Sequence, residues 1–228
     1  AAGYKSGSNA FLFQSESNDG IRFFSDDDFN YSRDDNFSLS VWVKRFHKNT
    51  GSADPSTGTG AQPIFTRGAQ QTSYGIDYDY VNNKVRAGVR PDGSNIFIQH
   101  TMVDDLLEWH HLAFTFESGS ATGMKLYVDG ELKGTSTTTG AGYRITGSNN
   151  FTSSVDSINT ETDVLSIGGN NVLGGSSRYY NGFIQYPRVY SRTLSQKDVH
   201  QLYQEPDGIT ETKITDVKIS LKNPQNVL

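Results

Sequence analysis

Apolar and polar residues alternate with a period of two along most of this chain, and this alternation constrains the fold more than any other feature. The segment FSLSVWVK places Phe37, Leu39, Val41 and Val43 on one side of an extended backbone. Because neighbouring side chains of a β-strand point to opposite faces of a sheet, this segment is predicted to be a strand. Similar patterns predict strands in YGIDYDY (74–80), VNNKVRAGVR (81–90), WHHLAFTF (109–116), LYVDGEL (126–132), ETDVLSIGG (161–169) and NGFIQYPRVY (181–190).

Two residue pairs predict the hairpin turns that join these strands. Asp129-Gly130 lies between two apolar strand segments, and Asp-Gly is a preferred pair for a two-residue hairpin turn. Asn82-Asn83 follows YGIDYDY, and asparagine tolerates the left-handed backbone that such turns require. Long loops are expected where Gly, Ser, Thr and Asn accumulate, at residues 47–63 and about 134–162.

One segment, RTLSQKDVHQLYQEP, has the pattern of a short helix instead. Ser195 can cap the helix together with Asp198, and Leu194 can pack on Val199 as a hydrophobic staple. Pro206 marks its end.

The composition of the chain fits a β-sandwich and excludes several kinds of partner and chemistry. The 228 residues include 23 Gly, 13 Phe and 12 Tyr, as expected for short strands and tight turns. The net charge is −5 and Lys and Arg form no cluster, so nucleic acid is not an expected partner. No apolar run approaches the roughly 20 residues of a membrane span, so membrane insertion is not expected. Cys is absent, which excludes disulfides, thiolate catalysis and Cys-based zinc sites.

The adjacent histidines of WHHLAFTF suggest a metal site or an acid–base pair, but strand geometry favours a structural role. His110 shares the side of Leu112 and Phe114, while His111 points with Trp109 to the opposite face. Two ligands for one ion would need a spacing of two along a strand, so the pair is interpreted as structural.

Several segments together resemble laminin-G-like domains of the concanavalin A-like lectin/glucanase superfamily. These are FSLSVWVK, WHHLAFTF, MKLYVDGEL, LSIGGN and YYNGFIQYPRVYSRTLSQKDVHQLY, in the order and at about the spacing of that family, over residues 9–205. The resemblance implies an all-β fold, a two-sheet antiparallel sandwich (concanavalin A-like jelly roll) with one sheet concave outside and a short helix near the C-terminus. We assign residues 1–206 to this domain and residues 207–228 to a C-terminal strand or a linker to a further domain.

Some members of the superfamily are laminarinase-like glycoside hydrolases with a Glu-x-Asp-x-x-Glu strand. The nearest segment here begins with Glu161 and Asp163, but Ser166 replaces the acid that would protonate the leaving group. We therefore expect no catalytic residues and no enzyme activity.

Members of the superfamily often hold a structural calcium ion, which the resemblance makes a candidate here. The usual acidic ligand corresponds to Gln185, which lacks charge. A second candidate is the acidic run of Asp26, Asp27, Asp28, Asp34 and Asp35, which has no calcium-loop spacing. We expect no cofactor, or at most one weak structural calcium ion.

Two groups of residues combine the aromatic planes and polar side chains that sugars require. The first group lies in a glycine-rich loop and the second in a tyrosine-rich strand. They are Asn170, Asn171, Arg178, Tyr179 and Tyr180, and Tyr74 and Tyr78. The alternative is that the tyrosines pack in the core and that the asparagines build turns.

The leading hypothesis is a non-catalytic recognition module that binds a glycan or cell-surface receptor. It would be extracellular, on a cell surface or a virion surface such as a phage fibre or decoration protein. The first alternative is a structural or assembly domain that contacts neighbouring protein subunits. The second alternative is a laminarinase-like glycoside hydrolase.

Overall fold

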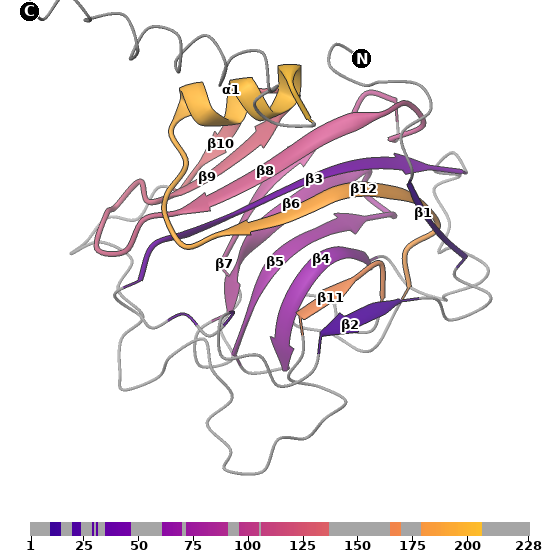
Figure 1. The fold of residues 1–228 in the computed structure, drawn as a ribbon, viewed down its shortest axis with the longest axis horizontal. Helices are drawn as coiled ribbons and strands as arrows, with labels where there is room; N and C mark the ends of the chain where they lie inside the picture. Colours follow the sequence, from indigo (N-terminus) through magenta and orange to yellow (C-terminus); the bar gives the residue numbers. More distant parts are fainter. Residues whose placement is uncertain are drawn as a thin grey trace, which may run out of the picture.

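The computed structural model describes residues 10–14, 20–23, 29, 31, 35–46, 61–69, 72–90, 96–104, 106–136, 165–169 and 179–206. They form two antiparallel sheets of six strands, which pack face to face (Figure 1). Sheet A has the order β1 (Phe11–Phe13), β12 (Gly182–Tyr190), β3 (Phe37–Arg45), β8 (His110–Phe116), β9 (Met124–Val128), β10 (Glu131–Thr135). Sheet B has the order β2 (Ile21–Phe23), β11 (Leu165–Ile167), β4 (Ala61–Ala69), β5 (Thr72–Asp79), β6 (Lys84–Arg90), β7 (Ile96–Thr101). The predicted all-β sandwich is confirmed.

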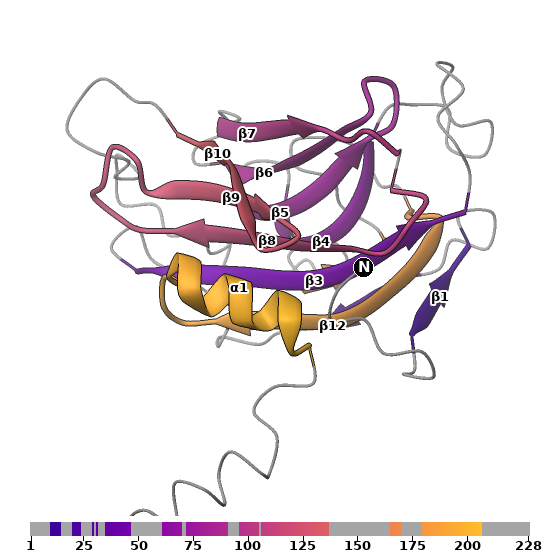
Figure 2. The same cartoon turned by 90° about the horizontal axis from the view of Figure 1, so that it is seen from above.

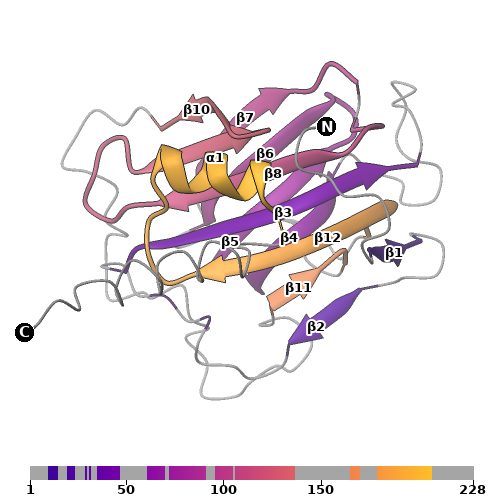
Figure 3. The ribbon, with the colours of Figure 1, turned by 45° about the horizontal axis from the view of Figure 1, so that its top comes forward.

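The core lies between the two sheets and follows the alternation seen in the sequence. Phe37, Leu39, Val41 and Val43 are fully buried in one cluster with the inward-facing residues of sheet B. Trp42, on the opposite side of β3, is also buried, because the helix α1 (Gln196–Gln204) covers the outer face of sheet A (Figures 2 and 3). Sheet A is therefore buried on both sides at its centre.

Helix α1 begins as the sequence predicts. The Ser195 hydroxyl accepts a hydrogen bond from the Asp198 amide, and the Asp198 carboxylate accepts one from the Ser195 amide. Leu194 and Val199 lie in a second buried cluster with residues of β8 and β9, which confirms the predicted staple.

The two predicted turns differ in outcome. Asp129 and Gly130 both have positive φ angles, 53° and 78°, as expected for the two-residue turn between β9 and β10. Between β5 and β6 the register joins Asp79 to Lys84, so the turn has four residues, and only Asn83 of the predicted pair is left-handed, with φ 52°.

The predicted long loops lie mostly outside the described residues, as does the assigned segment 207–228. Residues 61–63 begin β4 and residues 134–135 end β10, so both loops are shorter than the sequence suggests. No helix in the described ranges is long and apolar enough to cross a membrane.

Candidate functional site: a loop rim at one end of the sandwich

The tyrosines predicted to stack on a ligand lie in the core. Tyr74, Tyr78 and Tyr180 are fully buried. The Tyr74 hydroxyl donates to the Phe29 carbonyl at 2.9 Å, and the Tyr78 ring centroid lies 4.3 Å from the Arg45 guanidinium carbon. Buried rings offer no face to a sugar, so the packing alternative applies to these three tyrosines.

The other predicted ligand residues belong to the glycine-rich loop. Tyr179 is half-buried and pairs with Gly169 in an isolated bridge beyond the end of β11. Asn170, Asn171 and Arg178 lie outside the described residues, so their role stays a prediction.

Several connections meet at the end of the sandwich where β3 ends and β8 begins. The Met102 amide donates to the Asn83 carbonyl at 2.9 Å, and the Arg45 amide donates to the Leu106 carbonyl at 2.7 Å. The Phe46 amide donates to the Asn181 carbonyl at 3.3 Å. We call this end the loop rim and define it by residues 44–46, 80–83, 102–104, 106–110, 129–130 and 179–183.

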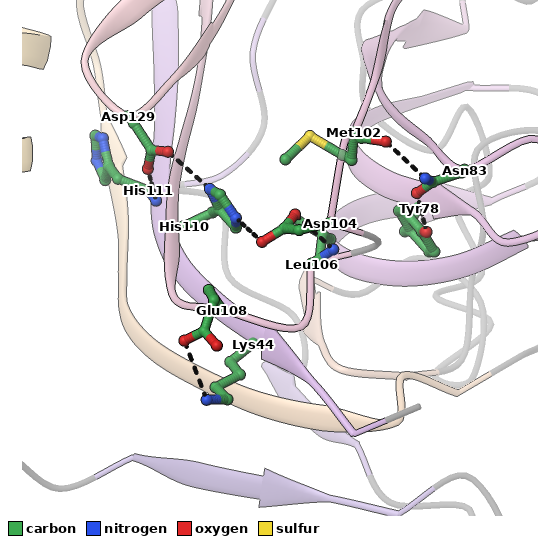
Figure 4. A network of polar contacts seen from close by, with 10 residues as sticks. All are labelled: Lys44, Tyr78, Asn83, Met102, Asp104, Leu106, Glu108, His110, His111 and Asp129. Carbon is green, nitrogen blue, oxygen red and sulfur yellow. Dashed lines mark hydrogen bonds and ion pairs between the residues drawn. The ribbon is translucent and has the colours of Figure 1, made fainter. Parts of the chain in front are cut away.

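The two histidines occupy opposite faces of β8, as strand parity predicts. In register, His110 pairs with Val43 of the core and His111 pairs with Trp42 beneath α1. Figure 4 shows His110 at the rim, between two carboxylates from different connections. Its Nδ1 lies 2.7 Å from Asp129 Oδ2, and its Nε2 lies 2.7 Å from Asp104 Oδ2.

The two carboxylates determine the protonation of His110. Burial lowers the pKa of His110, but the hydrogen bonds and charges of Asp129 and Asp104 outweigh burial and raise the pKa above its ordinary value. Burial raises the pKa of Asp104, but the contact with His110 and hydrogen bonds from two backbone amides outweigh burial, so the pKa of Asp104 lies below its ordinary value. A protonated His110 can donate from both ring nitrogens, one to Asp104 and one to Asp129, and these contacts favour the protonated ring.

His111 lies in a different environment, on the outer face of sheet A beneath α1. Its Nε2 lies 2.9 Å from Ser40 Oγ, and its ring lies beside Trp42 with centroids 5.5 Å apart. Burial lowers the pKa of His111 to about 4, so the ring is neutral near pH 7. A serine beside a neutral imidazole is a possible nucleophile and base. Both side chains are buried beneath α1, however, where a substrate does not reach them.

Three aromatic side chains gather on the outer side of the rim. The Phe183 ring packs edge-on against Phe46 with centroids 4.8 Å apart, and Trp109 lies 6.1 Å from Phe183. All three are half-buried. Lys44 and Glu108 form an ion pair of 3.6 Å beside them, with 32% and 77% of the side chains exposed. We call these five residues the aromatic cluster.

The sequence predicted only that Trp109 shares a strand face with His111. The missed signal is that the same parity puts Phe183 and Lys44, which pair in register, on that outer face of sheet A. A helix of nine residues covers only part of such a face.

The outer face of sheet B carries a second polar arrangement. Arg86 donates to both oxygens of fully buried Asp77 at 2.6 Å, and its guanidinium carbon lies 5.1 Å from the Phe97 ring centroid. Ser166, the residue in place of the hydrolase acid, is buried on this face, while Glu161 and Asp163 lie outside the described residues. The carboxylate of Asp77 is held in its ion pair, which makes it a poor proton donor.

The candidate metal ligands are not brought together in the described ranges. Gln185 is buried in β12, in register with Trp42. Of the acidic run, only Asp35 is described. No three His, Cys, Asp or Glu side chains of the described residues form a group that could hold a metal ion. The calcium ion stays a prediction.

Comparison with known families gives one match over most of the chain. A family model described as the concanavalin A-like lectin/glucanases superfamily matches residues 15–200. A search of curated proteins gives no match.

Solved structures share the fold at low sequence identity. The heptameric SAP-like pentraxin from Limulus polyphemus is 15% identical with a TM-score of 0.52, over 91% of this chain and 81% of the pentraxin. The CBM40 of Ruminococcus gnavus IT-sialidase is 13% identical with a TM-score of 0.52, over 86% of this chain and all of the CBM40. Botulinum neurotoxin type C is 15% identical with a TM-score of 0.53, over 81% of this chain but only 39% of the toxin chain.

Proposed function

The chain belongs to the concanavalin A-like lectin/glucanase superfamily, and we propose that it is a non-catalytic recognition module that binds a glycan at the loop rim. The observation that carries this proposal is the aromatic cluster. Trp109, Phe183 and Phe46 are half-buried rings next to the charged pair of Lys44 and Glu108.

This combination of side chains matches the chemistry of a pyranose. A sugar ring has an apolar C–H face that packs on an aromatic plane, and hydroxyls that need nearby donors and acceptors. Lys44 supplies donors and Glu108 supplies acceptors within one ion pair at the edge of the rings. Tyr179 belongs to the loop rim and pairs with Gly169 beyond β11, while Asn170, Asn171 and Arg178 stay predicted ligand residues.

Among the described residues, the side chains most suited to catalysis are already engaged in other contacts. Ser40 and His111 are sealed beneath α1, and both ring nitrogens of His110 face carboxylates. These contacts support binding without chemistry.

Proteins of similar fold suggest the first ligands to test. Cell entry of botulinum neurotoxin type C depends on interaction with two ganglioside molecules, and the Ruminococcus gnavus CBM40 is bound to α2,3-sialyllactose. The likeness to this chain is one of fold, so sialylated glycans are a starting point for a broad screen. A glycan-binding module would act outside the cell, on a cell or virion surface.

A glycan array with variants of the rim tests the proposal. We expect wild-type protein to bind at least one glycan, Trp109→Ala to lose that binding and Leu132→Ala to keep it. Leu132 is a matched control because it is a 46% exposed apolar residue on β10, away from the cluster. Absence of any hit, or a hit that Trp109→Ala leaves unchanged, contradicts binding at the rim.

A second candidate function, assembly with other protein subunits, is favoured by one specific observation. Phe11 and Leu12 of edge strand β1 are each 51% exposed, and Phe23 of edge strand β2 is 42% exposed. Both strands lie on the same side of the sandwich (Figure 3). Exposed apolar edge strands are typical pairing surfaces. Light scattering of the purified chain tests this function. A stable oligomer that dissociates into monomers in the Phe11→Lys variant supports it, and a wild-type monomer counts against it.

A further inference from the structure

The loop that carries Trp109 contacts sheet A through the ring of His110, in addition to the Leu106 carbonyl and the exposed ion pair of Glu108 with Lys44. This loop, residues 102–104 and 106–109, connects β7 of sheet B to β8 of sheet A. Asp104 Oδ2 lies 2.7 Å from His110 Nε2, and Asp104 Oδ1 accepts the Leu106 amide at 3.2 Å. The His110 ring therefore links the loop to the β9–β10 turn, where Asp129 binds its other nitrogen (Figure 4).

Both links exist together only while His110 carries two ring protons. A neutral imidazole has one N–H and one acceptor nitrogen, and an ionised carboxylate is an acceptor only. When His110 loses a proton, one of the two carboxylates faces a lone pair instead of a donor. That contact becomes repulsive and has to open or recruit a water molecule.

The contact with Asp104 is the one expected to open. Asp129 is held a second time, because its Oδ1 accepts the His111 amide at 2.9 Å, and it sits in a tight two-residue turn. Asp104 follows Val103, whose side chain is fully exposed, and its other contacts, with the amides of Leu106 and Glu108, lie within the same loop and do not hold it to β8. The less restrained partner moves at the lower free-energy cost.

Among the described residues, the other charged groups near His110 are already paired or lie on another face. Glu108 and Lys44 pair with each other at the outer edge. His111 faces α1, and the charges of Asp129 and of Arg188, a residue of β12, act on it in opposite directions. His200 of α1 lies over Gly130 of the β9–β10 turn. Asp104 and Asp129 are thus the two carboxylates that act on His110.

We propose that His110 is a proton-dependent clamp that holds the Trp109 loop in place, so that glycan binding at the rim weakens when His110 loses its proton. The proposal rests on the proposed function for its effect on binding, but the clamp itself depends only on the network of Figure 4. Binding is strongest below the pH at which His110 titrates and falls by roughly fivefold or more above it, the lower range of coupling between sites.

The clamp is tested without any ligand by nuclear magnetic resonance of the full chain. The ring nitrogens of His110 and the indole N–H of Trp109 are followed between about pH 5.5 and 9. We expect the Trp109 resonance to shift with the same midpoint as His110. In Asp104→Asn the His110 midpoint falls and the Trp109 shift no longer follows it. His200→Asn removes a neighbouring histidine outside the clamp and leaves the wild-type behaviour.

The outcomes separate the clamp from the glycan function. A Trp109 resonance that stays constant while His110 titrates overturns the clamp, whether or not a glycan binds. A Trp109 resonance that follows His110, in a protein that binds no glycan of the array, supports the clamp and rejects the proposed function. With a glycan in hand, equal affinity on both sides of the His110 midpoint also overturns the clamp.

Discussion

Trp42 of β3 stacks on Tyr203 of α1, with ring centroids 5.6 Å apart and ring planes 14° apart. This contact joins the helix to the outer face of sheet A and seals His111 from solvent. The loop rim begins where this cover ends, so the position of α1 determines which outward side chains of sheet A remain available to a ligand.

Removal of the Tyr203 ring is expected to weaken the attachment of α1. Tyr203→Ala should lower the free energy of unfolding by about 2 kcal/mol, since a large half-buried ring and its stacking contact are lost. Tyr203→Phe keeps the ring and should stay within about 0.5 kcal/mol of wild type. Urea unfolding measures both, and equal stability of the two variants contradicts the role of the stack.

The cap of α1 gives a second, smaller effect. Ser195→Ala removes the acceptor for the Asp198 amide and should cost about 1 kcal/mol. Lys197→Ala changes an exposed residue of the same turn and serves as the control. A loss in the control as large as that in Ser195→Ala would show that the cap is not responsible.

The neutral state of His111 predicts a loss of stability in acid. Its pKa falls from an ordinary value near 6.5 to about 4 in the folded chain. A lowered basic pKa favours folding above about pH 6.5, and this contribution is lost as the pH falls towards about 4. The total is of the order of 3 kcal/mol. Unfolding measured across this range should show a shallower pH dependence in His111→Gln, and an unchanged slope would contradict the assignment.

His110 predicts the opposite dependence on pH. Its raised pKa gives stability that is fully present below about pH 6.5 and is lost as the pH rises through the folded value. Between neutral and alkaline pH, wild type should therefore lose stability relative to His110→Asn. If the difference between the two proteins stays constant over that interval, the interpretation of the two carboxylate contacts is wrong.

The buried ion pair of sheet B predicts a strong non-additive effect. Arg86→Met leaves the charge of fully buried Asp77 without its guanidinium and should cost about 3 kcal/mol. Adding Asp77→Asn in the same chain should recover part of this loss. A double-mutant cycle in urea measures the coupling, and additive losses would show that the pair contributes nothing of its own.

The strands with regular alternation could be predicted from the sequence, and the irregular ones could not. FSLSVWVK and WHHLAFTF keep a strict period of two, so the faces of His110 and His111 followed directly. In β4 the register shifts between Pro63 and Phe65, so that the adjacent residues Ile64 and Phe65 both lie in the core. The strand therefore lacks the period of two by which the other strands were predicted. The helix was predicted because its cap uses local contacts only.

The candidate site was harder to predict because it depends on contacts between distant segments. Tyr74 and Tyr78 have the composition of a ligand platform, but parity alone does not distinguish an inner face from an outer one. The link between Asp104 and His110 requires the loop after β7 to fold back onto β8. Phe183 packs against Phe46, although the two residues are 137 positions apart in the chain.

The central claim, that a glycan binds on Trp109 at the loop rim, is tested most directly by the two indole N–H resonances during titration with the best ligand from the array. Trp42 is buried beneath α1 and provides an internal control. The account predicts a saturable shift of the Trp109 resonance with Trp42 nearly unchanged. A glycan that binds with no shift at Trp109, or with its shifts on the Asp77–Arg86 face of sheet B, would contradict it.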